Sequence, residues 1–278
     1  MPNNTKEILE KYNIRLDKNK SQNYLVDNNK LENILKNADI QPDETILEIG
    51  AGIGTLTIPM AKKAKKVIAI EKDPLIADVL KQRLIREKID NVELIKGDAL
   101  KIDYPPFDKV VSNLPYQISS PVTFKLLEYP FKKAVLMYQL EFAKRMQAKP
   151  DTHEYSRLTV GLYFRCNAEI IDTLPPQSFI PQPKVNSAVI KLTPKENIDL
   201  PPLFDNVIRA LFQHRNKKAR KALIQSAHEL KTDKKQLKKQ LNMIDDPLLD
   251  EKVFKLTPEE ILKITQLIGE IIQWNMTQ

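Results

Sequence analysis

The distribution of glycine constrains this 278-residue chain more than any other feature of the sequence. The chain contains only six glycines, and three of them, Gly50, Gly52 and Gly54, fall within five residues. Glycine adopts backbone conformations that side chains forbid, so this cluster indicates unusual local geometry. The apolar run TILEIG (45–50) predicts a buried strand, and TLTIPMAKKA (55–64) predicts a helix after it. The glycines therefore mark a tight turn between a strand and a helix.

Strands and helices continue to alternate after this turn. We expect strands at 66–71, 91–98, 108–116 and 134–140, with helices over 73–87 and 119–128. Such alternation predicts an α/β fold with a mostly parallel, Rossmann-like sheet. Ligands of these folds bind at the carboxyl ends of the strands.

Two carboxylates follow the next two strands at this edge. Glu71 ends the second strand, where it can accept hydrogen bonds from both hydroxyls of a ribose, and Asp98 follows the third, where it can accept from an adenine amino group. The dinucleotide fingerprint G-x-G-x-x-G would need glycine at position 55, where the chain has Thr55. We therefore expect S-adenosylmethionine (SAM) beside Gly50, Gly52, Glu71 and Asp98. A nicotinamide cofactor and a turn without a ligand are the alternatives.

The tetrapeptide Asn113-Leu114-Pro115-Tyr116 follows the fourth strand. An exocyclic amine on a nucleobase is a poor nucleophile because its lone pair is delocalised into the ring. The side-chain oxygen of Asn113 and the backbone carbonyl of Leu114, released by the bend at Pro115, could accept both amine hydrogens. Tyr116 would stack on the base, and positioning would supply much of the rate. The pattern predicts an amino-group methyltransferase without distinguishing adenine, cytosine or glutamine. A structural turn is the alternative.

The C-terminal part of the chain differs in charge from the rest. The whole chain carries a formal net charge of +8, whereas the window 209–239 holds 11 Lys and Arg against 2 Asp and Glu, and so carries +9. A Pro-rich connector (194–202) precedes this window, and the apolar spacing beyond it is helical. We expect a methyltransferase domain over 1–195 and a small all-α domain over 196–278.

Concentrated positive charge is typical of surfaces that bind the phosphates of RNA. A solvated lysine-rich helix surface is the alternative. The expected RNA contacts are Arg215, Lys217, Lys218, Arg220 and Lys221.

Composition excludes several classes of protein. A single cysteine excludes an internal disulfide and a zinc site built on several thiolates, and three separated histidines leave no expected metal site. No apolar run approaches the roughly 18 residues of a membrane span, and the polar N-terminus is unlike a signal peptide. We expect a soluble, cytoplasmic protein, with a monomer as the default.

Seven segments between residues 21 and 223 resemble the ribosomal RNA small-subunit adenine dimethyltransferase family. They are SQNYLVD (21–27), EIGAGIGTLT (48–57), GDAL (97–100), SNLPYQISSPV (112–122), RMQAKPDTHEYSRLTV (145–160), SFIPQPKVNSAVIKL (178–192) and LFQHRNKKARKAL (211–223). Within the first segment, Tyr24 stands where many members have Phe.

The resemblance implies that four methyl groups pass from four SAM molecules to N6 of two adjacent adenosines near the 3′ end of small-subunit rRNA, during subunit assembly. It also implies that Asn23 and Leu25 line the SAM site with Asn113. Phe179 would form a second aromatic wall opposite Tyr116, since an enzyme that modifies a base must unstack it. A core role is the alternative for Phe179.

Two other functions stay open at this point. One is a large-subunit rRNA adenine dimethyltransferase of the antibiotic-resistance type. The other is a ribosome assembly factor or transcription factor of the same fold, in which methylation is incidental.

Overall fold

The computed structural model describes residues 5–12, 14, 23–196 and 199–276. The chain forms two compact units. The sheet unit comprises residues 1–143 and 167–194, and the helical unit comprises 144–166 and 195–278. The expected boundary after residue 195 lies one residue from the point where the chain passes from the sheet unit to the helical unit, between residues 194 and 195. The expectation placed residues 144–166 in the first domain, however, and this was wrong, because Tyr155, Val160 and Phe164 are buried in the core of the helical unit.

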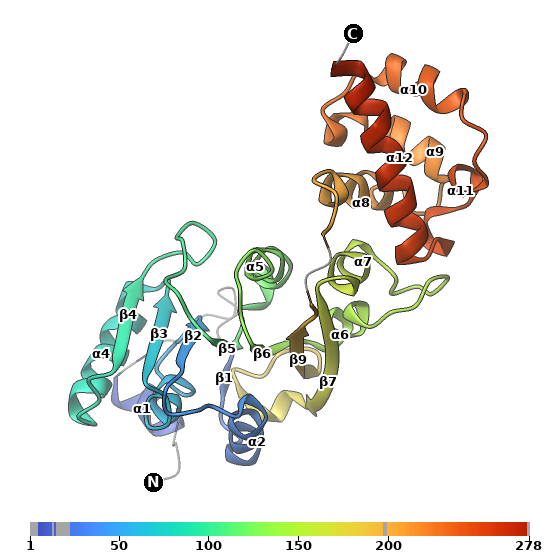
Figure 1. Ribbon diagram of the computed structural model, residues 1–278. Helices are drawn as coiled ribbons and strands as arrows, with labels where there is room; N and C mark the ends of the chain where they lie inside the picture. The colour runs from blue at the N-terminus through green and yellow to red at the C-terminus, as the bar shows by residue number, and fades with distance from the viewer. Residues whose placement is uncertain (1–4, 13, 15–22, 197–198, 277–278) are drawn as a thin grey trace. The chain divides into compact units, whose positions relative to one another are not determined.

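A seven-stranded sheet, in the order β4-β3-β2-β5-β6-β9-β7, forms the centre of the sheet unit (Figure 1). The strands β4, β3, β2, β5 and β6 run parallel to one another, and β9 pairs antiparallel with β6. The strands are β2 (Thr45–Ile49), β3 (Lys66–Glu71), β4 (Val92–Lys96), β5 (Lys109–Asn113), β6 (Lys133–Gln139), β7 (Cys166–Leu174) and β9 (Ser187–Pro194). Two short strands, β1 (Tyr24–Leu25) and β8 (Phe179–Ile180), pair antiparallel with each other. The expected Rossmann-like α/β fold is confirmed.

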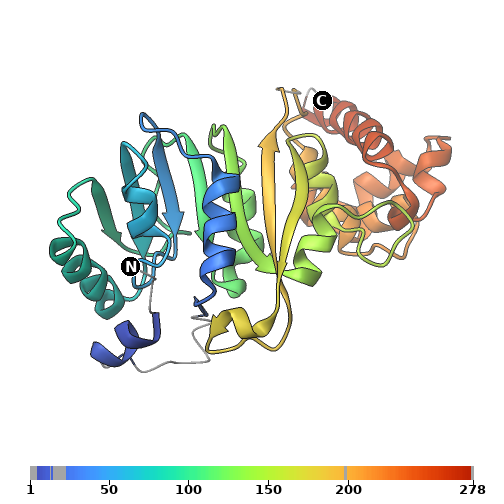
Figure 2. The same cartoon turned by 90° about the horizontal axis from the view of Figure 1, so that it is seen from below.

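The middle strands of this sheet consist largely of apolar residues, and they are buried on both faces. Ile46, Leu47, Val67 and Ile68 are fully buried or nearly so, as expected for parallel strands covered on both faces. The helices α2 (Asn28–Ala38) and α5 (Ser119–Leu126) lie on opposite faces of the sheet (Figures 1 and 2). The remaining helices that begin in this unit are α1 (Thr5–Lys11), α3 (Thr57–Ala61), α4 (Pro74–Arg86) and α6 (Leu140–Met146).

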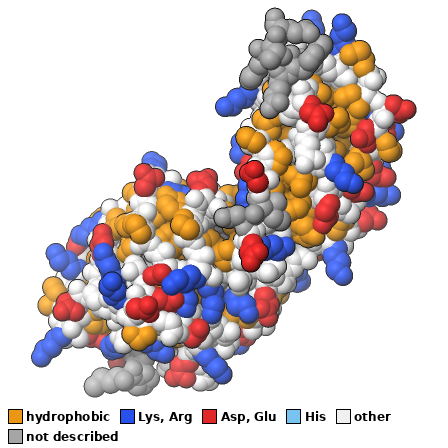
Figure 3. Space-filling view, in the orientation of Figure 1, with side chains coloured by type: hydrophobic (Ala, Val, Ile, Leu, Met, Phe, Trp, Pro, Cys, Tyr) orange, Lys and Arg blue, Asp and Glu red, His pale blue; other side chains and the backbone are white. Residues whose placement is uncertain are grey.

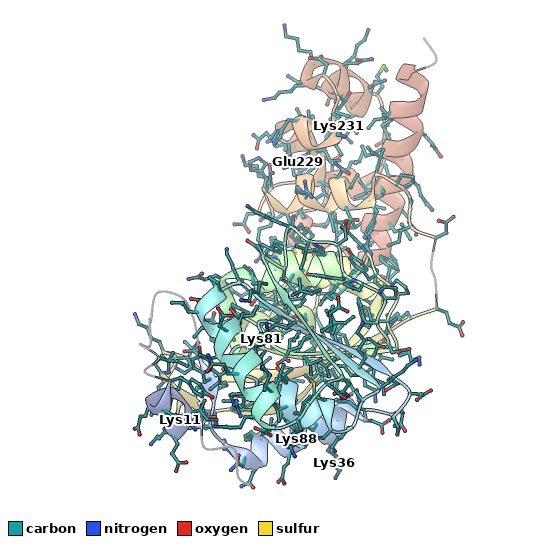
Figure 4. All side chains as sticks on the ribbon, turned by 90° about the vertical axis from the view of Figure 1, so that its left-hand side faces the viewer. Lys11, Lys36, Lys81, Lys88, Glu229 and Lys231 are labelled. Carbon is teal, nitrogen blue, oxygen red and sulfur yellow. The ribbon has the colours of Figure 1, made fainter. Side chains whose placement is uncertain are left out.

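The two helices that follow the glycine cluster, α3 and α4, agree to different degrees with the starts predicted from the sequence. The helix expected over 55–64 is confined to α3, because residues 52–56 form turns. The next helix, α4, begins where the sequence predicts. The Asp73 carboxylate accepts hydrogen bonds from the N–H groups of Leu75 and Ile76, and Pro74 occupies the first helical position. Figure 4 labels Lys81 on the exposed side of this helix.

The helical unit packs around one apolar core. Val207, Leu211, Leu223 and Ile264 are almost fully buried in it. Its helices are α7 (Arg157–Tyr163), α8 (Phe204–Phe212), α9 (Ala219–Gln225), α10 (Lys234–Asn242), α11 (Pro247–Asp250) and α12 (Pro258–Met276). Within the described ranges, no helix is long and apolar enough to cross a membrane.

Candidate active site

The carboxyl ends of four parallel strands meet at one edge of the sheet, in the order β4, β3, β2, β5. This order brings Asp98, Glu71, Gly50 and Asn113 to one place, since each of them ends or closely follows one strand. A cavity of about 480 Å³ opens there, within the range of small-molecule sites. The sequence-predicted residues that line it are Asn23, Leu25, Gly50, Gly52, Glu71, Asp98, Asn113, Leu114, Pro115 and Tyr116.

Two glycines line the cavity in conformations that other residues rarely adopt. Gly50 has φ +77° and Gly52 has φ +56°. A Cβ atom on Gly50 would lie 3.0 Å from Cδ of Pro115, and one on Gly52 would lie 3.1 Å from Cε1 of Tyr24. The positive φ at both positions would strain a larger residue, and its Cβ atom would also press on Pro115 or Tyr24, so glycine is favoured at both.

Glu71 combines burial with two backbone hydrogen bonds. Its two carboxylate oxygens accept from the N–H groups of Gly52 and Asp73, each at 2.8 Å. Burial raises the pKa of Glu71, and these N–H donors counteract the effect. Each oxygen keeps a second acceptor position, which suits it to the two hydroxyls of a ribose.

Asp98 is an ionised acceptor at the neighbouring strand end. The N–H of Leu100 donates to it at 3.0 Å, and Nζ of Lys72 lies 3.0 Å from its other oxygen. Both contacts lower the pKa of Asp98. The chemistry of these donors and acceptors and the volume of the cavity therefore fit SAM.

Asn113 and Tyr116 are both held by the surrounding protein. Nδ2 of Asn113 donates to the backbone carbonyl of Asn23 at 2.8 Å, which leaves its side-chain oxygen as the acceptor end of the amide. The Tyr116 hydroxyl lies 2.6 Å from Oγ of the buried Ser187 on β9. Burial raises the pKa of Tyr116, so its ring stays neutral. Ser187 was not predicted as a site residue, although it lies in the segment SFIPQPKVNSAVIKL.

Phe179 differs from the other predicted site residues. It is 0% exposed and does not line the cavity. Its backbone pairs with Leu25, and its ring belongs to the same buried cluster as Leu25 and Leu174. The structure therefore gives Phe179 a role in packing and not the expected place in the cavity wall.

Two buried ionisable groups at the glycine turn were not predicted from the sequence. Glu48 lines the cavity and accepts a hydrogen bond from the Thr57 hydroxyl, and burial raises its pKa to about 8. Arg83 projects from α4 and donates to the backbone carbonyl of Ile53, which fixes the turn. Each position carries a local signal, since a charged residue occurs there in an otherwise apolar run or helix face.

Two of the five residues expected to bind RNA donate hydrogen bonds to backbone carbonyls of the helical unit. Arg215 donates to the carbonyls of His153 and Thr152 at 2.7 and 3.0 Å. Arg220 donates to the carbonyls of Leu241 and Ile244 beside the C-terminus of α10. These donors stabilise the fold, and the role of the two arginines as RNA contacts stays a prediction.

The three lysines of the same segment are exposed. Lys217 contacts Gln225, and Lys218 lies 3.3 Å from a carboxylate oxygen of Asp250. Surface contacts of this kind contribute little stability and break easily. Lys221 is exposed on α9, and α10 exposes four more lysines, at positions 234, 235, 238 and 239.

Lysine and arginine side chains are not confined to one unit. They appear on the visible surface of both units, interspersed with acidic side chains (Figure 3). On the helical unit, Figure 4 labels the exposed Lys231 close to Glu229, whose carboxylate pairs with Arg209 at 3.4 Å.

The fold and the cavity together define a class of protein. A parallel sheet with a glycine turn after one strand, carboxylates after the next two and Asn-Leu-Pro-Tyr after the fourth is the arrangement of a SAM-dependent methyltransferase with a Rossmann-like fold.

Comparison with known proteins then gives the family. The sequence model of the ribosomal RNA adenine dimethylase family matches residues 13–268, and the chain belongs to this family. It is 74% identical over 265 residues to the probable ribosomal RNA small subunit methyltransferase A of Methanosphaera stadtmanae, covering 95% of this chain and 98% of that relative. The protein of the same name from Methanothermobacter thermautotrophicus is 52% identical over 267 residues, covering 96% of each chain.

Two solved structures agree with this assignment. A dimethyladenosine transferase from Plasmodium falciparum superposes with a TM-score of 0.73 at 31% identity, covering 89% of this chain and 98% of that one. The 23S rRNA methyltransferase ErmE superposes with a TM-score of 0.62 at 27% identity, covering 88% and 98%. The chain is thus a SAM-dependent rRNA adenine dimethyltransferase. The expected cofactor and reaction class are confirmed, and the nicotinamide alternative is wrong.

Proposed function

We propose that this enzyme dimethylates N6 of two adjacent adenosines near the 3′ end of small-subunit rRNA, with four methyl transfers in all, while the subunit assembles. Relatives that cover nearly the whole chain are named as small-subunit enzymes, which supports this substrate. One observation of the structure carries the chemistry: the amide of Asn113 is oriented by Asn23 at the edge of the cavity.

The cavity would hold SAM through residues of four neighbouring strand ends. When bound, SAM supplies a methyl group on a positively charged sulfur. Gly50 and Gly52 allow close approach of the backbone, and Asn23 and Leu25 form the adjoining wall. Glu71 accepts from the ribose hydroxyls, and Asp98 accepts from the adenine amino group. These roles follow from the acceptor positions that the two carboxylates keep.

Asn113 and Leu114 would hold the amine of the target adenosine. The side-chain oxygen of Asn113 and the carbonyl of Leu114 accept the two hydrogens, so that the nitrogen becomes pyramidal and its lone pair becomes available. Tyr116, anchored by Ser187, stacks on the base, and Pro115 fixes the bend between them. No strong base is needed, since the methylated amine loses its proton readily.

The helical unit would bind phosphates of the folded RNA through exposed lysines. Lys217, Lys218 and Lys221 keep the role expected from the sequence, and the α10 lysines extend this surface. Such binding depends on backbone charge and not on base sequence. The partner is the assembling small subunit, and the enzyme acts as a cytoplasmic monomer.

A second candidate substrate is large-subunit rRNA. It is favoured by the structural likeness to the 23S rRNA methyltransferase ErmE. A role as an assembly factor with incidental methylation is the third candidate.

The deciding experiment is methyl transfer from labelled SAM to ribosomal subunits that lack the modification, followed by digestion and mass spectrometry of the nucleosides. We expect N6,N6-dimethyladenosine at two neighbouring positions of small-subunit rRNA, and none with Asn113→Ala. Label confined to large-subunit rRNA would transfer the proposal to the second candidate. SAM binding without any label would favour the assembly factor.

A further inference from the structure

Lys125 lies outside the cavity and holds the loop that carries Asp98. It belongs to the last turn of α5, and its ammonium group donates to the backbone carbonyls of Ala99 and Ile102, the first at 3.0 Å. Ala99 follows Asp98 directly and lines the cavity with it, whereas Lys125 does not line it. A charged donor that serves two carbonyls of one short loop fixes that loop on the helix.

The aromatic ring of Tyr104 completes this contact. Nζ of Lys125 lies 4.5 Å from the centre of the ring, a distance at which the face of a tyrosine attracts a cation. The Tyr104 hydroxyl donates to the carbonyl of Ala99 at 2.9 Å. Two donors therefore meet at this carbonyl, and its oxygen uses both of its acceptor positions. The ring itself packs against Phe107 and Tyr129.

The position of this loop determines the position of the Asp98 carboxylate. The N–H groups of Lys101 and Ile102 donate to the backbone carbonyl of Asp98, at 2.8 and 3.3 Å. A shift of Ile102 would therefore move Asp98 as well. The cation beside the carboxylate is Lys72, at 3.0 Å. Lys125 contacts the backbone of the loop instead, so it acts on Asp98 through position.

Helix α5 connects Lys125 to the catalytic tetrapeptide. The helix begins at Ser119, directly after the short 3₁₀-helix that Tyr116 opens. The Thr123 hydroxyl donates to the carbonyl of Ser119 and lies 2.8 Å from the hydroxyl of the buried Tyr138 on β6. These contacts fix α5 on the sheet. A loop that is fastened to Lys125 is thus held at a set distance from Tyr116.

We propose that Lys125 is a positioning residue of the methyl-transfer reaction, which holds the Asp98 carboxylate in a fixed place relative to Tyr116. The inference rests on the adenine-binding role given to Asp98 under Proposed function. Asp98 would hold one end of the cofactor, and Tyr116 would hold the base that receives the methyl group. A misplacement of about 1 Å between reacting groups can slow a reaction roughly 100-fold. The fixed distance therefore serves transfer as well as binding.

The test replaces Lys125 by Met, which keeps the aliphatic stem and removes the ammonium group. Calorimetric titration of the full-length protein should show S-adenosylhomocysteine bound about five- to tenfold more weakly. Single-turnover methyl transfer at saturating SAM should slow roughly tenfold. A second ligand is the analogue of S-adenosylhomocysteine that carries purine in place of adenine. It has no amino group for Asp98 to accept, so Lys125→Met should change its affinity less than about twofold.

Lys109 provides a matched control for stability. It is a buried lysine that also donates to a backbone carbonyl, that of Asp39, and it lies 2.8 Å from a carboxylate oxygen of Glu44. Lys109 begins β5, so these contacts lie at the opposite edge of the sheet from the cavity. Lys109→Met should lower the melting temperature at least as much as Lys125→Met. Well below that temperature, it should leave the affinity for S-adenosylhomocysteine within about twofold of the parent.

Four results would overturn the proposal. An unchanged affinity of Lys125→Met for S-adenosylhomocysteine would show that the loop needs no such support. An equal loss for both ligands would show that Lys125 does not act through the amino-group contact. A full rate at saturating SAM would remove the link with Tyr116. A similar loss of affinity in Lys109→Met would reduce the effect to general stability.

The purine analogue separates failure of this proposal from failure of the assigned site. If the analogue binds the parent protein more weakly than S-adenosylhomocysteine and Lys125→Met has no effect, only the role of Lys125 is wrong. If the parent binds both ligands equally well, the adenine-binding role of Asp98 is wrong, and the proposal for Lys125 fails with it.

Discussion

Replacement of Arg220 by Met should destabilise the helical unit and should not remove a direct RNA contact. The guanidinium donates to the carbonyls of Leu241 and Ile244 and lies 3.1 Å from a carboxylate oxygen of Asp250. It thereby supplies donors and positive charge beside the C-terminus of α10, where backbone carbonyls lack helical partners. Methionine preserves much of the length of the side chain and removes these donors.

The magnitude follows from the two carbonyl contacts. A hydrogen bond from a charged donor contributes about 1.5–3 kcal/mol when it is buried, and these are only partly buried. We therefore expect a loss of about 2–3 kcal/mol for the pair. The exposed Asp250 adds little to this total. For a unit of this size, such a loss lowers Tm by about 10 °C.

The adjacent Lys221 serves as the control, because it is exposed on the same helix. Lys221→Met should leave Tm unchanged within about 1 °C and should reduce the salt dependence of RNA binding by roughly one phosphate contact. The assays are thermal unfolding and filter binding of an rRNA fragment over a series of KCl concentrations, well below Tm. The reasoning is refuted if Arg220→Met keeps the parent Tm and loses RNA affinity.

Two further predictions concern the cavity. Tyr116→Ala should slow single-turnover methyl transfer roughly 10- to 100-fold through lost base stacking, while calorimetry shows SAM affinity within about twofold of the parent. A large loss of SAM binding would instead identify Tyr116 as a cofactor residue. Burial raises the pKa of Glu48 from 4.5 in the unfolded chain to about 8, so the folded protein retains a proton that the unfolded chain releases. Stability from this group is thus fully present below pH 4.5 and is lost as the pH rises through about 8. Urea unfolding of the cofactor-free protein should show that Glu48→Gln removes this decline, and identical pH profiles for the two proteins would contradict the assignment.

The edge of the sheet at which the chemistry occurs could be predicted from the amino-acid sequence. In a parallel sheet, the carboxyl ends of the strands meet at the same edge, so the order of motifs along the chain predicts their proximity in space. Gly50, Glu71, Asp98 and Asn113 could therefore be grouped without coordinates, and the structure places all four around one cavity. The N-terminus of α4 was predictable for a similar reason, since its cap involves neighbours in sequence.

Which side chains have partners within the protein depends on long-range packing and could not be predicted from the sequence. Arg220 and Lys221 are adjacent in the sequence, yet only Arg220 reaches carbonyls more than twenty residues away. Phe179 likewise lies in the core because of its pairing with Leu25. The segment 144–166 joins the helical unit through apolar contacts with residues beyond 200. Residue type and local spacing specify what a group can bind, but long-range packing determines whether another part of the chain already binds it.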